Sequence, residues 1–411
     1  MDGQSSEGLE TCCCIVGGGP AGIMLGFLLA RSGVQVTVLE KHADFLRDFR
    51  GDTIHPSTLE LMHELGILEE FLKRPHNEVR EITAQIGGET FPIGDFTHLP
   101  TRCKFLAFMP QWDFLNFIVE QTRSLPRFQL RMETEVTGLI EDAGRVKGVR
   151  ARTRAGEIEV RADLVVGADG RHSVVRRSAG LAVDDLGAPM DVLWMRVSRR
   201  PGDPQQSLGN VDAGGILIMI ERGDYWQCGL VIRKGGIDEI KGKGLAAFQE
   251  RLVRFAPVLA GRVSELASWD QIKLLTVTVD RLRKWHRPGL LCIGDSAHAM
   301  SPIGGVGINL AIQDAVAASN ILAARLLVGT VDEACLIAVE RRRTMPTRLT
   351  QRVQLFIQKR VITRVLDASK PVKIPAIFRL MRRMPVLRRI PARIVGMGFR
   401  PEHVKSEWAR G

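Results

Sequence analysis

Hydrophobic and polar positions change period along the chain, and the first forty residues already show both kinds. Residues 12–16 form an uninterrupted apolar run, a glycine-rich turn follows at 17–22, and the apolar positions then take a helical period as far as residue 32. A second strand-like segment, in which Val34, Val36 and Val38 alternate with polar residues, covers residues 34–39. This order predicts a strand, a helix and a second strand, a unit that requires a parallel sheet with a right-handed crossover.

The rest of the chain alternates between helical and strand-like patterns. Leu59, Met62 and Leu65 recur at three-residue spacing, which predicts a helix over residues 53–73. Further helices are predicted at 113–122, 245–255 and 308–327. Short apolar runs or strict alternation between polar and apolar positions predict strands at 80–108, 162–166, 192–197, 216–221, 225–232, 273–279 and 290–293.

The last segment, residues 331–411, combines helical periodicity with repeated prolines. Because a proline inside a helix removes a hydrogen bond and clashes with the preceding turn, we expect these prolines to break the segment into short helices. They are Pro346, Pro371, Pro375, Pro385 and Pro391.

Charge is unevenly distributed along the sequence. Residues 341–411 hold 19 Lys and Arg against three acidic residues, a net charge of +16, whereas the other 340 residues hold 38 basic and 43 acidic side chains, a net charge of −5. A basic segment of this kind can face anionic lipid, nucleic acid or only water. We expect its apolar side to pack on the domain that contains the first strand–helix–strand unit, with peripheral membrane contact as the alternative. No recognisable nucleic-acid motif accompanies the charge, so no nucleic-acid partner is expected.

Composition narrows the class of protein. With 411 residues, 45% of them hydrophobic and 25% charged, the chain is expected to fold into two or three units, and dominant disorder is excluded. We see neither a secretory signal nor a run of 18 apolar residues, so a cytoplasmic protein is expected. The seven cysteines show no disulfide framework and no metal-binding spacing, and the nine histidines none either. Cys12, Cys13 and Cys14 read as small, buried strand residues, and no metal is expected.

The turn after the first strand matches the pattern G-x-G-x-x-G at Gly17, Gly19 and Gly22. In this pattern the first glycine permits a tight turn, the second lets a pyrophosphate approach the backbone, and the third lets helix and strand pack closely. The helix N-terminus then offers N–H groups and a positive dipole to the phosphates. Glu40, 18 residues after Gly22, is placed to bind a ribose diol. This motif predicts a dinucleotide, either FAD or NAD.

Two further turns decide between these cofactors. One follows the strand that ends at residue 166 and contains Asp169 and Gly170. The other follows the strand ending at residue 293 and contains Asp295, which can hold the hydroxyls of a polyol, and then a proline- and glycine-rich loop at 302–309 that can lie against a flat ring. The dipole of the helix after this loop would stabilise negative charge on a reduced ring. We therefore expect an extended dinucleotide with a redox ring, which is FAD.

With these three motifs in this order, the chain resembles the FAD-dependent single-component aromatic hydroxylases, the para-hydroxybenzoate hydroxylase-like family. The resemblance covers about residues 12–330. It implies that Asp169 and Gly170 lie near the pyrophosphate and NAD(P)H, that Asp295 holds the ribityl chain, and that Arg50 and Gln111 add FAD contacts. The expected cofactor-binding residues are Gly17, Gly19, Pro20, Ala21, Gly22, Glu40, Lys41, Arg50, Gln111, Asp169, Gly170, Gly294, Asp295, Pro302, Gly305, Gly307, Ile308 and Asn309.

The resemblance also implies a fold and its division. The fold class is α/β: a Rossmann-like FAD-binding (GR2-type) domain with an inserted β-rich substrate domain and a helical C-terminal tail. The expected division assigns 1–79, 109–189 and 279–330 to the discontinuous FAD-binding domain, 80–108 and 190–278 to the β-rich substrate domain, and 331–411 to the basic helical C-terminal segment.

The activity implied is that of a monooxygenase. NADPH or NADH would reduce FAD, O₂ would form a C4a-hydroperoxyflavin, and an aromatic or polycyclic, lipophilic small molecule would be hydroxylated. Two alternatives stay open: a flavin-dependent reductase of isoprenoid double bonds, and a non-catalytic flavin-bound interaction protein. A flavin halogenase is disfavoured because we find no W-x-W-x-I-P run. The substrate, the choice between NADH and NADPH, and the oligomeric state are not fixed by the sequence.

Three residues are catalytic candidates: His298, Pro302 and Tyr225. For His298, a structural hydrogen bond that fixes the turn is the favoured interpretation over proton transfer. Alternation along residues 225–232 points Tyr225 and Val231 to one face, which looks either into a substrate cavity over the flavin or outward to solvent. Tyr225 is the only tyrosine, so the paired tyrosine relay of para-hydroxybenzoate hydroxylase cannot exist in this chain.

Overall fold

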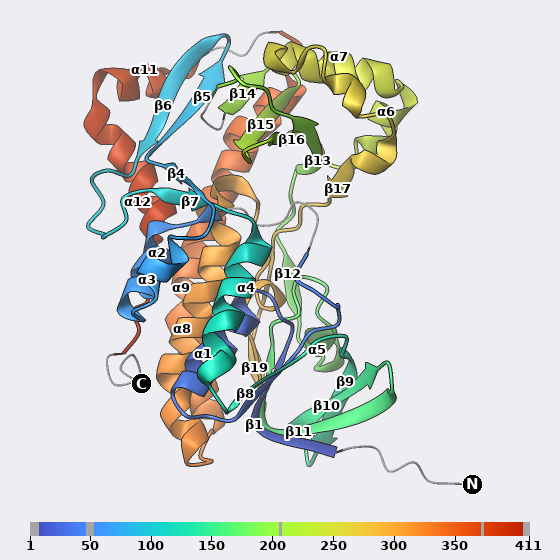
Figure 1. Cartoon of the computed structure of the whole chain (residues 1–411), viewed down its shortest axis with the longest axis vertical. Coiled ribbons are helices and arrows are strands. Elements are labelled where there is room, and N and C mark those ends of the chain that lie inside the picture. The colour runs from blue at the N-terminus through green and yellow to red at the C-terminus, as the bar shows by residue number, and fades with distance from the viewer. Residues whose placement is uncertain (1–7, 47–52, 205–207, 371–373, 406–411) are drawn as a thin grey trace.

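A mixed sheet with parallel central strands forms the base of the molecule, and a second, largely antiparallel sheet lies at the opposite end (Figure 1). The computed structural model describes residues 8–46, 53–204, 208–370 and 374–405. The first sheet has the order β19-β20-β11-β1-β2-β8, with β10 and β9 continuing from β11. Its strands are β1 (Gly8–Val16), β2 (Val36–Leu39), β8 (Phe128–Arg131), β9 (Glu135–Asp142), β10 (Arg145–Thr153), β11 (Gly156–Gly167), β19 (His286–Arg287) and β20 (Leu290–Cys292).

The first βαβ unit has the predicted form. β1 and β2 are parallel neighbours, and α1 (Pro20–Arg31) connects them. Proline at the first position of α1 suits a helix start, where its missing N–H costs nothing. Cys13 and Cys14 are fully buried in β1, as the apolar run predicted, and burial raises the pKa of the Cys14 thiol to about 12. The central strands are therefore apolar on both faces, as a covered parallel sheet requires.

The second sheet has the order β17-β13-β16-β15-β14-β5-β6, and all its pairs are antiparallel except β14 with β5. The hairpin β5–β6 thus joins strands that lie more than a hundred residues later, while the division into domains stays a prediction. One face packs against α6 (Ile237–Gly242) and α7 (Leu245–Phe255) through a core that includes Trp226 and Phe248. The strands are β5 (Glu81–Ile86), β6 (Glu89–Asp95), β13 (Met190–Ser198), β14 (Leu208–Asp212), β15 (Gly215–Glu221), β16 (Tyr225–Arg233) and β17 (Lys273–Leu275).

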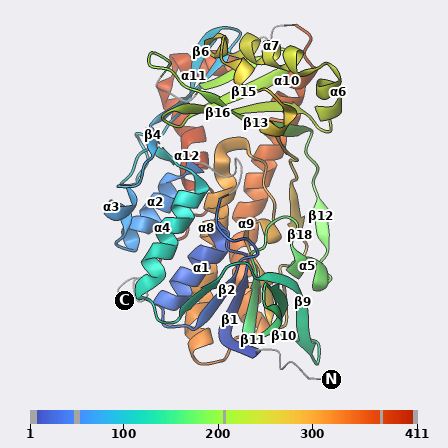
Figure 2. The same ribbon diagram turned by 45° about the vertical axis from the view of Figure 1, so that its right-hand side comes forward.

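Two long helices connect the two ends, as the turned view shows (Figure 2). α8 (Val306–Leu327) packs against α1 of the first sheet, and α9 (Glu333–Ile357) runs back along α8 toward the second sheet. The helical stretch 303–327 is long and apolar enough to cross a membrane, contrary to the expectation from the sequence. Because 72% of that window is buried inside the protein, its apolar character is accounted for by packing.

The remaining elements are short. In one small sheet β7 lies between β3 and β4 and pairs with both, and in the other β12 pairs with β18. Their bounds, with those of the remaining α-helices, are β3 (Thr53–Ile54), β4 (Asn77–Val79), β7 (Leu106–Phe108), β12 (Val183–Asp185), β18 (Asp280–Leu282), α2 (Pro56–Glu64), α3 (Leu68–Phe71), α4 (Gln111–Gln121), α5 (Val174–Ser178), α10 (Thr363–Asp367), α11 (Ala376–Arg383) and α12 (Arg389–Met397). A π-helical turn, η7 (Gln358–Ile362), joins α9 to α10.

Two sequence predictions about helices were wrong. The helix predicted over residues 53–73 is divided, because Gly66 takes a left-handed conformation with φ of 74° and ends α2 before α3 begins. Pro346, in contrast, does not break the tail: it lies inside α9, which is continuous over 25 residues. One face of α9 is buried on both sides of the proline, where Arg343 and Gln351 are almost fully buried. This packing outweighs the destabilisation of roughly 3 kcal/mol that a proline causes inside a helix.

The basic tail packs on the body of the protein beside the hairpin β5–β6 (Figure 1). Phe378 of α11 meets Phe91 of β6, with ring centroids 6.1 Å apart. Ala392 of α12 belongs to a buried cluster with Phe96 and Leu99. The sequence predicted packing on the FAD-binding part alone. α12 does contact α2, which lies in the range expected for that part, but α11 and α12 also cover β6.

Candidate functional site

Three turns meet at one edge of the first sheet because the strands that lead into them are parallel neighbours in register. Val16 at the end of β1 pairs with Gly167 of β11, and Gly167 pairs with Cys292 of β20. Carboxyl ends of parallel strands lie at the same edge, which is where ligands of such sheets bind. The turns that begin at Gly17, Ala168 and Ile293 therefore converge, and Gly294 lies so close to α1 that a Cβ on it would be 3.1 Å from Ala21.

The glycines of the first turn are required for two different reasons. Gly17 has φ of 106°, and a Cβ there would lie 2.4 Å from the carbonyl oxygen of Ala168. A Cβ on Gly22 would lie 2.0 Å from the carbonyl oxygen of Gly17. Gly19 is different, since it has an ordinary φ of −76° and a Cβ on it would meet nothing within 4 Å. Protein packing explains Gly17 and Gly22, and open space in front of Gly19 is what a pyrophosphate needs.

α1 begins at this open space with Pro20 and Ala21, and Gly19 is its N-cap without a side-chain cap. The acid after β2, Glu40, is almost fully buried and faces the same turn: Oε2 accepts the N–H of Gly18 at 2.8 Å, and Oε1 accepts the N–H of His42 at 3.0 Å. Lys41 is exposed beside it. The carboxylate of Glu40 is thus oriented by backbone groups before any ligand binds.

The second turn holds Asp169 between the sheet and α5. Its Oδ2 accepts the N–H groups of Val174 and Val175 at 2.7 and 3.2 Å, so this carboxylate caps α5. Burial raises the pKa of Asp169, against hydrogen bonds from Ser173 and the backbone that lower it. The other oxygen, Oδ1, is buried and finds no hydrogen-bond partner among the described residues. Gly170 follows with φ of 79° and open space where a Cβ would lie.

The third turn presents one side chain outward. Between residues 289 and 299, Asp295 is the single exposed residue in an otherwise buried run. Gly294 before it has φ of 60°. This places the carboxylate of Asp295 at the shared edge of the three turns, where the sequence predicted a polyol contact.

The loop after this turn leads into α8. Pro302 and Ile303 begin a short 3₁₀ turn, Gly305 takes a left-handed conformation with φ of 61°, and α8 begins at Val306 without a side-chain cap. A Cβ on Gly307 would meet only Met300, at 4.0 Å, so the start of α8 also faces open space. Ile308 is nearly buried.

Asn309 has a role that the sequence did not reveal. Its Oδ1 accepts the N–H of His55 at 2.8 Å and the hydroxyl of Thr58 at 2.7 Å, and its Nδ2 donates to the carbonyl oxygens of Thr53 and Gly305. The side-chain amide is thus satisfied by protein, and a cofactor contact at Asn309 stays a prediction for its backbone. The Asn309 side chain fixes β3 and the start of α2 against the first turn of α8.

His55 is a site residue that sequence reasoning missed. It is 1% exposed, its backbone binds Asn309, and its Nδ1 lies 2.7 Å from the carbonyl oxygen of Val395 on α12. Burial lowers the pKa of His55 to about 4, against hydrogen bonds from the backbone of Val395 and Gly304 that raise it. The ring is therefore neutral at physiological pH. His55 matters because it joins two elements that are far apart in the sequence, so no local sequence pattern could have identified it.

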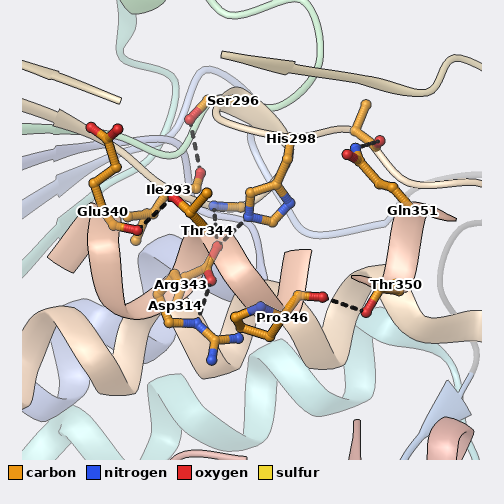
Figure 3. Close-up of polar contacts among 12 residues, drawn as sticks. Ile293, Ser296, His298, Asp314, Glu340, Arg343, Thr344, Pro346, Thr350 and Gln351 are labelled. Carbon is orange, nitrogen blue, oxygen red and sulfur yellow. Dashed lines mark hydrogen bonds and ion pairs between the residues drawn. The ribbon is translucent and has the colours of Figure 1, made fainter. Parts of the chain in front are cut away.

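Behind the third turn lies a buried chain of charged groups (Figure 3). His298 Nε2 lies 2.5 Å from Asp314 Oδ2, and Arg343 Nε donates to Asp314 Oδ1 at 2.8 Å. Arg343 also contacts Glu402 at 3.1 Å. Burial alone would raise the pKa of Asp314, but His298 and Arg343 outweigh it and hold that pKa below its usual range. Because Asp314 also accepts the N–H of Gly294, His298 belongs to the framework that fixes this turn, and a catalytic role for it stays a prediction.

Tyr225 lies away from the three turns. Its ring lies under Arg196, whose guanidinium carbon is 3.7 Å from the ring centroid, in a surface hollow also lined by Asp224, Glu265 and Lys273. Val231, on the same face of β16, instead clusters with Ile303. Ile303 belongs to the loop 302–307, which we call the flavin loop. Six residues of strand separate the two by about 20 Å. We therefore do not carry Tyr225 forward as a catalytic candidate.

Two weaker predictions have different outcomes. Gln111 is the first residue of α4, which packs beside α1, and its contact with a cofactor stays a prediction. Arg50 lies outside the described residues. Among the described residues there is no group of three or more His, Cys, Asp and Glu that could hold a metal ion.

The residues at the shared edge fit FAD in both shape and chemistry. Gly19 and Gly170 face space that no atom of the described residues fills, Gly307 faces space bounded only by Met300 among them, and Asp169 directs a buried oxygen that has no partner in the described part of the chain. The N-termini of α1 and α8 carry no acid in their first turns, which suits a pyrophosphate and a ring that becomes negative on reduction. Glu40 and Asp295 would bind the ribose and the ribityl hydroxyls, respectively.

Comparison with known proteins agrees with this geometry. Over 94% of this chain and 93% of the relative, the sequence is 37% identical to 6-methylpretetramide 4-monooxygenase of Streptomyces rimosus. The fold matches that of p-nitrophenol 4-monooxygenase from Pseudomonas putida with a TM-score of 0.75 and 22% identity, covering 94% of this chain and 97% of the other. It also matches anhydrotetracycline hydroxylase from Streptomyces rimosus with a TM-score of 0.73 and 22% identity, covering 94% and 76%.

The FAD binding domain family matches residues 10–353, which include all three turns and most of α9. The predicted resemblance, the fold class and the cofactor are thereby confirmed. The chain belongs to the FAD binding domain family and is an FAD-dependent monooxygenase of the aromatic hydroxylase type.

Proposed function

We propose that this enzyme uses NADPH or NADH and O₂ to hydroxylate an aromatic, polycyclic and lipophilic small molecule. The observation that carries the proposal is the convergence of three turns at one sheet edge, with open space in front of Gly19 and Gly307. The relative with 37% identity acts, by its name, on 6-methylpretetramide, which supports a polycyclic substrate.

Bound FAD would supply the redox chemistry, taking two electrons from the nicotinamide and passing them to O₂. The protein's own part is to bind, orient and exclude water. The N–H groups at the start of α1 would hold the pyrophosphate, Asp295 the ribityl chain, and the loop 302–307 the ring. Where this loop meets the second sheet, Ile303 contacts a cluster that includes Val192 and Val231. An apolar boundary at this point favours a lipophilic substrate.

Replacing Asp295 with alanine tests the cofactor site. We expect a folded protein that purifies with less than about a tenth of the wild-type flavin, because the lost carboxylate hydrogen bonds are worth about 1.5–3 kcal/mol. Flavin content is measured by absorbance of the released cofactor, and folding by circular dichroism. Asp224→Ala, an exposed aspartate on the second sheet, is the control and should keep its flavin. Full flavin content in Asp295→Ala would show that the ribityl contact is misplaced.

Wild-type enzyme is then screened with phenols, polyketides and quinone precursors for substrate-stimulated O₂ uptake. The monooxygenase consumes NAD(P)H and O₂ together and releases hydroxylated product. A reductase of isoprenoid double bonds would consume NAD(P)H with substrate in the absence of O₂. A protein that binds flavin but shows no turnover with any of these would support the interaction-protein alternative.

We further propose that the basic tail contacts anionic membrane surfaces. In α11, α12 and the turn between them, Ile377, Leu380, Met384, Val386 and Ile390 are 43% to 58% exposed. Residues 374–400 contain seven arginines and no carboxylate. Phe378 and Ala392 pack on the protein, while these apolar side chains stay exposed among cations, which suits the headgroup boundary of an anionic bilayer.

Vesicle flotation tests this contact. We expect the enzyme to float with vesicles containing phosphatidylglycerol and not with neutral phosphatidylcholine vesicles, and high salt should reverse binding. The variant Leu380→Glu/Ile390→Glu should lose flotation while keeping its flavin. Binding to neither kind of vesicle would overturn the proposal, and so would salt-sensitive retention by an acidic protein without any flotation.

A further inference from the structure

Three glutamines form a row on the buried face of α9 and the π-helical turn that continues it. Gln351 and Gln354 lie in α9, and Gln358 is the first residue of the π-helical turn η7. Their spacing of three and four residues places them on one side of the helix. Each is at most 3% exposed, which is unusual for so polar a side chain. Polar side chains this deep must satisfy a specific set of hydrogen bonds.

All three amides bind the segment that leads from the third turn into the flavin loop. Gln351 Nε2 donates to the carbonyl oxygens of Asp280 and Ala299, at 2.7 and 3.3 Å. Gln354 binds this segment in both directions: its Oε1 accepts the N–H of Ser301 at 3.1 Å, and its Nε2 donates to the carbonyl oxygens of Ser301 and Ile303 at 2.9 and 3.0 Å.

Gln358 completes the row by donating to the hydroxyl of Ser301 at 2.9 Å. Residues 299–303 form no regular secondary structure apart from the beginning of the 3₁₀ turn, so their backbone groups cannot satisfy one another. Ser301 is 1% exposed, and its unpaired N–H and C=O would each be costly. An amide both donates and accepts, which explains why glutamine suits position 354 better than a carboxylate or an aliphatic side chain, while at position 358 the amide acts as a donor.

We propose that Gln354 and Gln358 are positioning residues for the flavin loop, so that the end of α9 and the turn η7 form an obligatory part of the cofactor site. This inference rests on the proposed function, in which loop 302–307 lies against the ring. Both residues lie beyond residue 353, where the match to the family ends. The loop is held in its ring-binding shape by side chains from the helix, and this pre-organisation spares the loop an ordering cost when FAD binds.

The test compares apoprotein variants in FAD titrations, followed by quenching of flavin fluorescence. We expect Gln354→Ala to raise the dissociation constant of FAD about tenfold or more, since it removes three hydrogen bonds that order the loop. Gln358→Ala, which removes one, should raise it about threefold. Thr350→Val is the matched control: its hydroxyl donates only to the carbonyl oxygen of Pro346 within α9, and its FAD affinity should stay within about twofold of wild type (Figure 3).

Gln354→Glu separates positioning from mere packing. Glutamate has the same size and can still accept from Ser301, but when ionised it cannot donate to the carbonyl oxygens of Ser301 and Ile303. Protonation restores one donor, and burial raises the pKa of such a carboxyl. We therefore expect the FAD affinity of Gln354→Glu, relative to Thr350→Val, to improve as the pH falls from about 8 to about 6. Bound flavin in Gln354→Ala should also show altered fine structure in its visible absorption band.

Two results would overturn the positioning proposal, and a third would overturn the proposed function. Gln354→Ala with reduced thermal stability but unchanged FAD affinity and flavin spectrum would assign these glutamines to folding alone and overturn the proposal. A pH-independent Gln354→Glu would do the same. If wild-type apoprotein itself failed to bind FAD, the proposed function would fail. Measuring wild type and Thr350→Val first distinguishes this failure from a failure of the positioning proposal alone.

Discussion

Replacing Gly19 with leucine should abolish FAD binding and leave the fold intact. The backbone at Gly19 has φ of −76°, which any residue adopts, and a Cβ there meets no protein atom within 4 Å. The leucine would instead occupy the space assigned to the pyrophosphate. We expect FAD affinity to fall at least about 100-fold, equivalent to about 2.7 kcal/mol, with unfolding behaviour close to wild type. Equilibrium titration with FAD and thermal unfolding of the apoprotein measure the two effects.

Two other glycines provide the controls. Gly138→Leu in β9 also enters open space, at a position distant from the three turns, and should change neither FAD affinity nor stability. Gly22→Ala should mainly lower the stability of the fold, because its Cβ would collide with the carbonyl oxygen of Gly17 and force α1 away from β1. Gly19→Leu that still purified with full flavin would contradict the placement of the pyrophosphate.

Removing the buried guanidinium by Arg343→Met should destabilise the protein by about 3 kcal/mol or more. Arg343 is 1% exposed and bridges Asp314 and Glu402, which are 0% and 5% exposed. Breaking a buried ion pair leaves a carboxylate whose desolvation is no longer compensated. Asp314 retains His298 and the N–H of Gly294, and Glu402 retains Arg342, so we expect the lower end of the range for such a loss. Guanidinium unfolding of the apoprotein measures the effect.

The neighbouring Arg342→Met is the matched control. Arg342 also pairs with Glu402, but its side chain is 33% exposed, so its loss should cost at most about 1 kcal/mol. The pKa of Asp314 is held below its usual range in the folded state, so the stability it contributes is present above the unfolded pKa and is lost as pH falls through the folded one. Arg343→Met should therefore lose part of the acid sensitivity of wild type. Equal destabilisation by both arginine variants would contradict a special role for the buried pair.

Local patterns in the sequence were sufficient for the cofactor and the fold class. Three glycine-and-acid turns after apolar strands identified FAD, and comparison with known proteins confirmed the family, the fold and the monooxygenase activity. These signals are local because a turn that binds phosphate needs particular residues at fixed offsets, such as Gly17, Gly19 and Gly22. The start of α1, the strand β16 and the helix α7 followed the hydrophobic period for the same reason.

The continuity of α9 and the surroundings of β16 depend on how distant segments pack together, so they could not be predicted from local patterns. Pro346 is tolerated because α9 is buried along α8, and a local rule for proline could not include that packing. Tyr225 and Val231 share a face of β16, yet only the tertiary arrangement shows which of them lies near the flavin loop. Sequence alternation specifies the face of a strand and not its surroundings.

What the sequence determined by itself is which cofactor is bound, and it predicted the three turns that meet at one sheet edge, since short-range geometry and backbone chemistry suffice for that recognition. What only the tertiary structure decided is how the site is held in shape: Gln354 against Ser301, Arg343 against Asp314, and His55 against Asn309 and α12. Each of these contacts joins residues more than 25 positions apart. A buried polar group acquires its partner from the packing of whole elements, and no period or motif in a single chain encodes that pairing locally.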